Sequence, residues 1–170
     1  MDLKNELSDD LIKIIEARHH DPFSILGAHI QGGKTTVTLF LPDTESASLE
    51  NKLAMERIEG TDFFQWIGSS SKLQKHYQVI RIASNGDQIS HHDPYCFLPQ
   101  ISEFDLHLFS EGKHWHAYRI LGAHQHKVDG IDGVLFATWA PSAQRVSIIS
   151  DFNQWDGRKH PMRVRGNSGV

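Results

Sequence analysis

HHDPFSILGAH, residues 19–29, is the stretch that decides the fold, because the chain repeats it ninety-five residues later as HWHAYRILGAH, residues 114–124. The two copies share His19 and His114, and then the unbroken run Ile-Leu-Gly-Ala-His. With ordinary residue usage, a five-residue match in a chain of this length has odds on the order of one in a hundred. The match alone is suggestive, and the residues that follow each copy strengthen it.

The segments after the two copies also correspond to each other. They are TVTLFLPDTESASL, residues 36–49, and LFATWAPSAQRVSI, residues 135–148. When four extra residues are allowed in the second copy, Pro42 aligns with Pro141. Each copy then consists of a strand, a proline turn and a strand at equal spacing. A long repeat of this kind indicates a repeated structural unit, so we interpret the chain as a duplicated module.

The local patterns favour strands over helices. One helix is predicted over residues 8–17, where Ser8 supplies a cap before apolar residues at helical spacing. Asn85-Gly86 is a hairpin signal. Short strands separated by turns are typical of β-sandwiches, and immunoglobulin-type sandwiches have about 100 residues, close to the repeat offset. The predicted strands are residues 35–41, 62–67, 76–83, 133–140 and 144–150.

We therefore predict an all-β fold with two modules. Residues 1–105 are expected to form an immunoglobulin-like β-sandwich with a short amino-terminal helix. Residues 106–170 are expected to form a second β-sandwich that is cut before its last strands, because the repeat aligns Gly169 with about Gly60 of the first copy. The chain is expected to be the front part of a longer protein.

Composition limits the possible partners. The chain has 39% apolar residues, enough for a packed core, and its formal charge of −4 argues against nucleic acid, because phosphate binders usually have a basic face. No apolar run approaches the roughly 20 residues that span a bilayer, and the acidic start MDLKNELSDD is unlike a secretory signal. Cys96 is the single cysteine and is expected to be a small buried hydrophobe. We therefore expect a cytoplasmic protein that contacts no membrane.

Twelve histidines raise the question of a metal site. His114-x-His116 and His124-x-His126 would each put two imidazoles on one face of a strand. Since no third ligand motif accompanies them, we expect neither a metal nor a cofactor, and instead histidines that hydrogen-bond at loop edges. Gly27 in the first copy is expected, like its partner in the second, to adopt backbone angles that other residues resist.

Four motifs carry a resemblance to a known family. They are HHDPFSILGAH, DLHLFSEGKHWHAYRILGAH, VLFATWAP and DFNQWDGRKHPMRVRGNSGV. Together they resemble the amino-terminal region of bacterial glycogen branching enzymes, which belong to glycoside hydrolase family 13. The resemblance covers nearly the whole chain and is most specific over residues 104–170.

The resemblance implies an architecture and an activity. Such enzymes carry an extra first β-sandwich, a second one like carbohydrate-binding module family 48, a catalytic (β/α)₈ barrel and a small β domain. The implied reaction is retaining transfer of an α-1,4-glucan segment to a 6-hydroxyl, with two carboxyl groups about 5 Å apart. A barrel needs about 250 residues, so we assign no catalytic residue here and expect this chain alone to be inactive. The implied partners are α-glucan, or glycogen, and the enzyme's own barrel, in a monomeric parent.

The candidate sugar contacts are Trp155 and Asn153. Trp155 matches the tryptophan of the F-N-x-W pattern that stacks on glucan in family 48 modules, and Asn153 stands beside it. A glucose ring presents a C–H face to an aromatic plane, while amides engage its hydroxyls. The alternative is that Trp155 packs into a core or against the neighbouring barrel. Core packing is expected for Trp139, and core or interface packing for Trp66 and Trp115.

The first copy departs from this pattern, because LENKLAMERIEG, residues 49–60, contains no aromatic residue. Its expected role is that of a spacer or docking surface that influences which glucan chains are transferred. Two further readings are a stand-alone glucan-binding adaptor and the front of a related family 13 debranching enzyme. The unfinished second sandwich argues against the adaptor, since it leaves sheet edges open. The doubled module argues against a debranching enzyme, which usually carries one.

Overall fold

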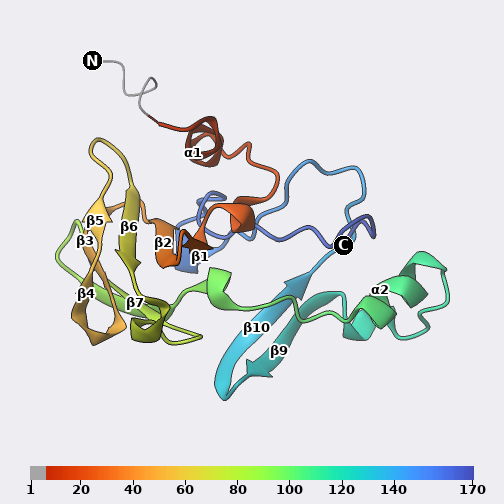
Figure 1. Ribbon diagram of the computed structural model, residues 1–170. Coiled ribbons are helices and arrows are strands. Elements are labelled where there is room, and N and C mark those ends of the chain that lie inside the picture. The colour runs from red at the N-terminus through yellow and green to blue at the C-terminus, as the bar shows by residue number, and fades with distance from the viewer. Residues whose placement is uncertain (1–6) are drawn as a thin grey trace. The chain divides into compact units, whose positions relative to one another are not determined.

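The computed structural model describes residues 7–170, which divide into two compact units (Figure 1). The first unit contains the residues up to Leu98 together with the segment Ile149–His160. The second contains Pro99–Ile148 and Pro161–Val170. Within residues 7–170, no helix has the length and apolar content needed to cross a membrane.

Two four-stranded antiparallel sheets form the first unit, in keeping with the all-β sandwich predicted from the sequence. Its core contains side chains from both sheets, including Val37 and Phe64 from one and Leu49 and Val79 from the other. One sheet has the order β1 (Gly27–Gln31), β2 (Lys34–Phe40), β6 (Phe63–Gly68) and β5 (Glu56–Arg57). The other has the order β4 (Leu53–Ala54), β3 (Thr44–Leu49), β7 (Gln78–Ala83) and β8 (Gln88–His92).

The predicted strands of the first copy are confirmed as β2, β6 and β7. Asn85-Gly86 lies in the turn between β7 and β8, where Gly86 has a φ of 89°. Trp66 on β6 is buried in the core, as expected. Cys96 is partly buried and packs against the same core.

The predicted amino-terminal helix is α1 (Asp9–Ile15). The Ser8 hydroxyl accepts a hydrogen bond from the Leu11 backbone N–H at 3.4 Å, which satisfies a donor that a helix start leaves unpaired. Ile14 is buried in a second apolar cluster with Phe40 and Phe63. The helix thus covers one end of the sheet that contains β2 and β6.

A helix and a hairpin form most of the second unit. The hairpin pairs β9 (Gly122–Val128) with β10 (Ile131–Ala137) in antiparallel register (Figure 1). The helix α2 (Glu103–Ser110) contributes Leu106 to a small core with Ile101 and Ala137. Partly buried apolar residues around that core are Ile120, Leu121, Leu135 and Val170.

Helix α2 was not predicted from the sequence. Its start, Ser102, caps the Asp105 backbone N–H at 3.1 Å, as Ser8 caps α1. Phe104 is largely exposed, so the apolar residues of EFDLHLFS do not form one clean stripe, and the periodicity that reveals amphipathic helices is weak. Each helix is followed, two residues past its end, by a residue with left-handed φ. These residues are Ala17, at 57°, and Gly112, at 68°, and they lie ninety-five residues apart.

The repeat is also visible in side-chain contacts. In the first copy, His19 Nε2 lies 3.4 Å from the Asp10 carboxylate, and in the second His114 Nε2 lies 3.0 Å from that of Asp105. In each pair, a histidine that follows the helix contacts an aspartate in the first turn of that helix. The duplicated unit therefore begins at the helix, upstream of the sequence match, and continues through a 3₁₀ turn into a strand.

The shared Ile-Leu-Gly-Ala-His run forms the same turn twice. His29 Nε2 lies 3.0 Å from the Leu26 carbonyl oxygen, and His124 Nε2 lies 2.8 Å from that of Leu121. These loop-edge contacts confirm the role expected for both histidines. The turn glycines have a φ of 89° at residue 27 and 106° at residue 122, values that favour glycine.

Two sequence-based expectations about the second copy are wrong. Residues 144–150 form no strand, and only an isolated bridge pairs Ser147 with Pro161. Strand β10 ends at Ala137, so Trp139 lies past it, 57% exposed, against the edge of Phe109 and outside the core. The physical reason is the same in both cases, since β-branched and aromatic residues form strands and cores only where a partner covers them. Trp115 is 91% exposed and outside the core, so interface packing is what is left of the expectation for that residue.

The first sandwich is closed by a buried polar pair. The Tyr77 hydroxyl donates to Asp93 Oδ2, while Asp93 Oδ1 accepts from the Tyr95 backbone N–H at 3.0 Å. Tyr77 and Asp93 are both 1% exposed. Burial raises the pKa of Asp93 to about 6, although the hydrogen bonds from Tyr77 and Tyr95 oppose that change.

Alanine at the two turn glycines is expected to have unequal effects. At Gly27 an added Cβ would lie 2.7 Å from the Tyr95 Cβ, whereas at Gly122 it would meet only His124 Nε2, at 3.6 Å. Gly122→Ala should therefore lower the free energy of unfolding by the cost of left-handed φ, about 1–2 kcal/mol. Gly27→Ala adds a steric clash and should cost about 2–4 kcal/mol. Urea titration of both variants tests this, and equal losses would contradict it.

Asp93 is expected to make stability depend on pH. Burial raises the pKa of Asp93 from its ordinary value of 3.8 to about 6 in the folded state, so the folded protein binds a proton between pH 4 and 6 that the unfolded chain does not bind. The free energy of unfolding should therefore rise as the pH falls through this window, by on the order of 2 kcal/mol. Asp93→Asn should remove that rise when urea unfolding is measured at pH 7 and pH 4.5. An unchanged pH dependence in the variant would exclude Asp93 as its source.

Candidate functional site

The candidate site is the loop that contains Asn153 and Trp155. A single 3₁₀ turn, Asp151–Asn153, begins at Ser150. The Asn153 side-chain oxygen accepts from the Ser150 backbone N–H at 2.9 Å, and the Ser150 carbonyl accepts from the Asn153 backbone N–H at 3.1 Å. This reciprocal cap fixes the start of the loop.

Asn153 lies beneath the loop and not on its surface. It is 2% exposed, and its side-chain nitrogen lies 3.1 Å from His160 Nδ1. Burial and proximity to the Lys159 ammonium lower the pKa of His160, which favours the neutral imidazole. Asn153 thus joins the two ends of the loop, and its amide is occupied by protein partners.

Trp155 lies on the surface of the same loop. Its side chain is 64% exposed, and its indole N–H donates to the Asp151 carboxylate at 2.8 Å. The Trp155 backbone N–H donates to the Ser150 carbonyl at 3.0 Å. Phe152 is exposed as well, with its ring edge-on to His160 at 5.1 Å between centroids. The loop therefore holds two aromatic rings at the solvent, one of them fixed by a hydrogen bond.

The backbone at Trp155 is in an unfavourable conformation. Gln154 and Trp155 have φ values of 58° and 59°, in the left-handed region that non-glycine residues avoid. Each such residue costs on the order of 1 kcal/mol, and such strain is concentrated at binding and catalytic sites. The loop uses it to turn the indole away from the core.

Two cations follow the tryptophan. The Arg158 guanidinium pairs with the Asp156 carboxylate at 2.7 Å, which holds the pKa of Asp156 below its usual range. Lys159 Nζ donates to Gln154 Oε1 at 2.6 Å and lies 3.6 Å from Asp43 Oδ2. Its contact with Asp43 joins residues more than a hundred positions apart, and no local pattern predicts it.

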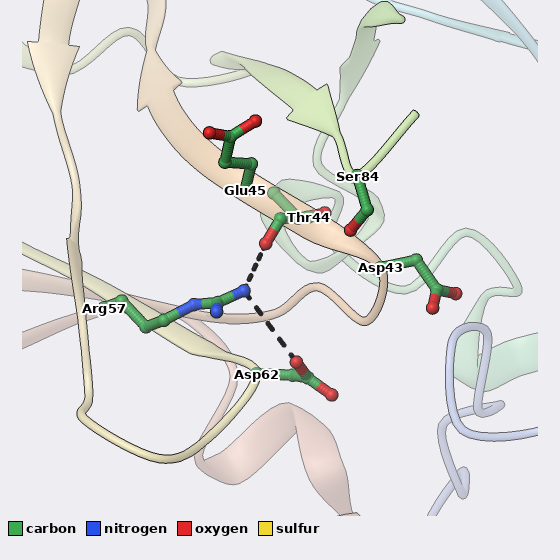
Figure 2. A pocket seen from close by; sticks show the side chains of 6 residues that line it. All are labelled: Asp43, Thr44, Glu45, Arg57, Asp62 and Ser84. Carbon is green, nitrogen blue, oxygen red and sulfur yellow. Dashed lines mark hydrogen bonds and ion pairs between the residues drawn. The ribbon is translucent and has the colours of Figure 1, made fainter. Parts of the chain in front are cut away.

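A polar hollow lies on the first sandwich next to this contact (Figure 2). Arg57 donates to the Thr44 carbonyl and lies 3.9 Å from Asp62. Figure 2 shows the Asp43 and Glu45 carboxylates pointing away from Arg57. The residues that line the hollow, about 580 Å³ in volume, are Asp43, Thr44, Glu45, Arg57, Asp62 and Ser84.

The histidine pairs of the second unit have protein partners. His114 pairs with Asp105 as described above, and His126 Nε2 lies 3.2 Å from Gln100 Oε1. The part of the chain that the structure describes contains no group of three or more His, Cys, Asp or Glu side chains arranged to hold a metal ion.

Comparisons with known proteins match two parts of the chain to two family models. A family model of the N-terminal domain of alpha-1,4-glucan branching enzyme GlgB matches residues 7–95. A model of carbohydrate-binding module 48, described as the isoamylase N-terminal domain, matches residues 120–170, which include the loop.

Similar proteins cover almost the whole chain. The 1,4-alpha-glucan branching enzyme GlgB of Cellvibrio japonicus is 49% identical over 178 residues, which cover 98% of this chain and 24% of that protein. The enzyme of the same name from Methylococcus capsulatus is 51% identical over 166 residues, which cover 97% of this chain and 22% of that protein. The chain thus spans about a quarter of the length of these relatives.

The first family model covers more than half of the chain, from α1 through the closing segment of the first sandwich. The resemblance inferred from the sequence motifs is confirmed. The chain belongs to the family of the N-terminal domain of alpha-1,4-glucan branching enzyme GlgB.

Proposed function

We propose that this chain is the non-catalytic N-terminal part of a 1,4-alpha-glucan branching enzyme, and that its aromatic loop contacts α-glucan. Two findings support the proposal. The similar proteins bear that enzyme's name, and the chain corresponds to 22–24% of their length. The catalytic barrel would lie in the remainder of the protein, beyond the first module and the second, which begins at α2.

In this proposal the chemistry takes place elsewhere in the parent protein. Retaining transfer needs a nucleophilic carboxylate and a second carboxyl as acid and base, about 5 Å apart. No residue of this chain is assigned to either role. The chain contributes by holding a glucan strand so that its length and approach to the barrel are controlled, and binding energy remote from the reacting bond serves this purpose.

The observation that carries the glucan contact is the exposed indole of Trp155. A large aromatic ring normally gains free energy by burial, yet this one is mostly exposed and is tied to Asp151 on a strained turn. Its N–H is already bonded, so the ring faces are the groups available to a ligand. A glucose C–H face is the complement of such a surface. The Asn153 side chain is buried and caps the start of the loop, and it is not proposed to touch sugar.

Of the two other readings of the sequence, the debranching enzyme is the closer competitor. The description of the family 48 module includes the isoamylase N-terminal domain. The match of residues 7–95 to a branching-enzyme domain favours branching over debranching and over a free adaptor. We further propose a monomeric, cytoplasmic parent, which agrees with the single, partly buried Cys96.

Trp155→Ala in the full-length protein should weaken retention in gels that contain glycogen by about tenfold, because a stacked ring contributes on the order of 1–2 kcal/mol. Trp155→Phe keeps a flat ring and should retain most of the binding. Trp115→Ala, which removes another exposed indole, serves as the control for general loss of aromatic surface. Equal retention of Trp155→Ala and the unaltered protein would rule out the loop as a glucan contact.

The full-length protein should convert amylose into a product with α-1,6 branches, while residues 1–170 alone should leave it unchanged. Deletion of residues 1–98 should shift the distribution of transferred chain lengths, because the first module is proposed to limit which chains reach the barrel. Enzymatic debranching followed by chain-length analysis measures both effects. Release of free maltose without branches, or an unaltered distribution after the deletion, would count against the corresponding part of the proposal.

A further inference from the structure

The aromatic loop is part of the first compact unit, although its sequence lies far from that unit's strands. Two side chains at the end of the loop account for this. The Arg158 guanidinium carbon lies 5.4 Å from the centre of the Phe40 ring, a geometry in which a cation is attracted to the ring face. Phe40 is in turn fixed in the buried cluster with Phe63.

Lys159 provides the second attachment. Its side chain is only 13% exposed, and its ammonium lies 3.6 Å from the Asp43 carboxylate. The same ammonium donates to Gln154 Oε1 at 2.6 Å. Asp43 follows Pro42 at the turn after β2, with a φ of 58°. A chain of contacts therefore runs from this turn through Lys159 to Gln154, the residue before Trp155.

The surroundings of Arg158 strengthen the attachment. Beyond its fork with Asp156, the negative charges of Asp62 and Asp43 raise the pKa of Arg158. Asp43 and Asp62 both line the polar hollow in Figure 2. The acidic turn residues of the first sandwich thus face a loop that ends in two cations, which is electrostatic complementarity between distant segments.

We propose that Asp43 and Phe40 of the first sandwich are positioning residues for the aromatic loop, which they hold through Lys159 and Arg158. Loss of either contact releases Gln154 and Trp155 from their left-handed backbone conformation, because that conformation persists only while surrounding contacts oppose its strain. The consequence for glucan binding rests on the function proposed above. The positioning itself does not.

Amide hydrogen exchange in the full-length protein, followed by mass spectrometry, tests the positioning directly. Asp43→Asn suits the left-handed backbone, which tolerates both residues, and removes only the charge. Exchange in peptides that cover residues 149–160 should accelerate about threefold, as expected for one partly exposed ion pair. Arg158→Gln should accelerate it more, by about tenfold. Glu45→Gln is the matched control, since Glu45 lines the same hollow with its carboxylate turned away from Arg57.

A charge swap separates positioning from general loosening. Asp43→Lys alone should accelerate exchange in residues 149–160, and the double variant Asp43→Lys with Lys159→Glu should restore most of the protection. The affinity for maltoheptaose should fall and recover in parallel. If the unaltered protein does not bind maltoheptaose, the proposed function fails, while the exchange data still decide the positioning. Equal exchange in Asp43→Asn and Glu45→Gln, or no recovery in the double variant, would overturn the inference.

Discussion

The buried hydrogen bond between Tyr77 and Asp93 is the interaction on which the first sandwich depends. It fixes the segment after β8, where Asp93 also caps the Tyr95 backbone N–H. Tyr95 then packs on Phe23 at 4.6 Å between ring centroids and leaves room only for hydrogen at Gly27. One polar pair thus connects the last strand of the sandwich with the turn that starts the first strand. A carboxyl group is kept in an apolar interior because its hydrogen bonds offset part of the cost of burial.

The same constraint explains the contrast between the two copies. In the second unit, Tyr118 aligns with Phe23 and Gly122 with Gly27. Tyr118 is largely exposed, and a Cβ at Gly122 would meet only His124 Nε2, at 3.6 Å. The local geometry of helix, turn and strand is nevertheless retained, because the contact between Asp105 and His114 and the left-handed glycine are internal to the copy. Short-range polar contacts therefore define the start of each module, while long-range packing distinguishes the first module from the second.

This division also marks how far the sequence could predict the structure. The repeat, the strands β2, β6 and β7, and the glycine turn follow from local pattern and were predicted. Helix α2 could have been predicted too, since shifting residues 8–17 by the repeat offset places them on residues 103–112. The exposure of Trp139 could not have been predicted, because it depends on which surfaces lie opposite its side chain. Alternation of apolar residues is the pattern of a strand over residues 144–150, but a strand needs a pairing along its length, and the strand pairing found here is one isolated bridge between Ser147 and Pro161.

The same limit applies to the two residues proposed for the candidate site. Trp155 was identified from a motif, and its exposure agrees with a role at the surface. Asn153 was named by its proximity in the sequence, yet the amide that could have met a hydroxyl is used to cap Ser150 and reach His160. A sequence motif can indicate that a residue belongs to a site. It does not indicate whether that residue contacts the ligand or stabilises the loop that carries the contact.

The placement of the loop gives the two copies different roles. A strained turn that exposes a tryptophan gains nothing from the hydrophobic effect and must be held by other contacts. The available ones are polar and reach back to the first sandwich through Lys159 and Arg158. The first copy has no aromatic residue over 49–60, and in the proposed function it contacts no sugar there. Its acidic turn at Asp43 instead stabilises the conformation of a loop that belongs, by sequence, to the second copy. The first copy thus contributes a structural role, through the turn at Asp43, to the loop that carries the surface role.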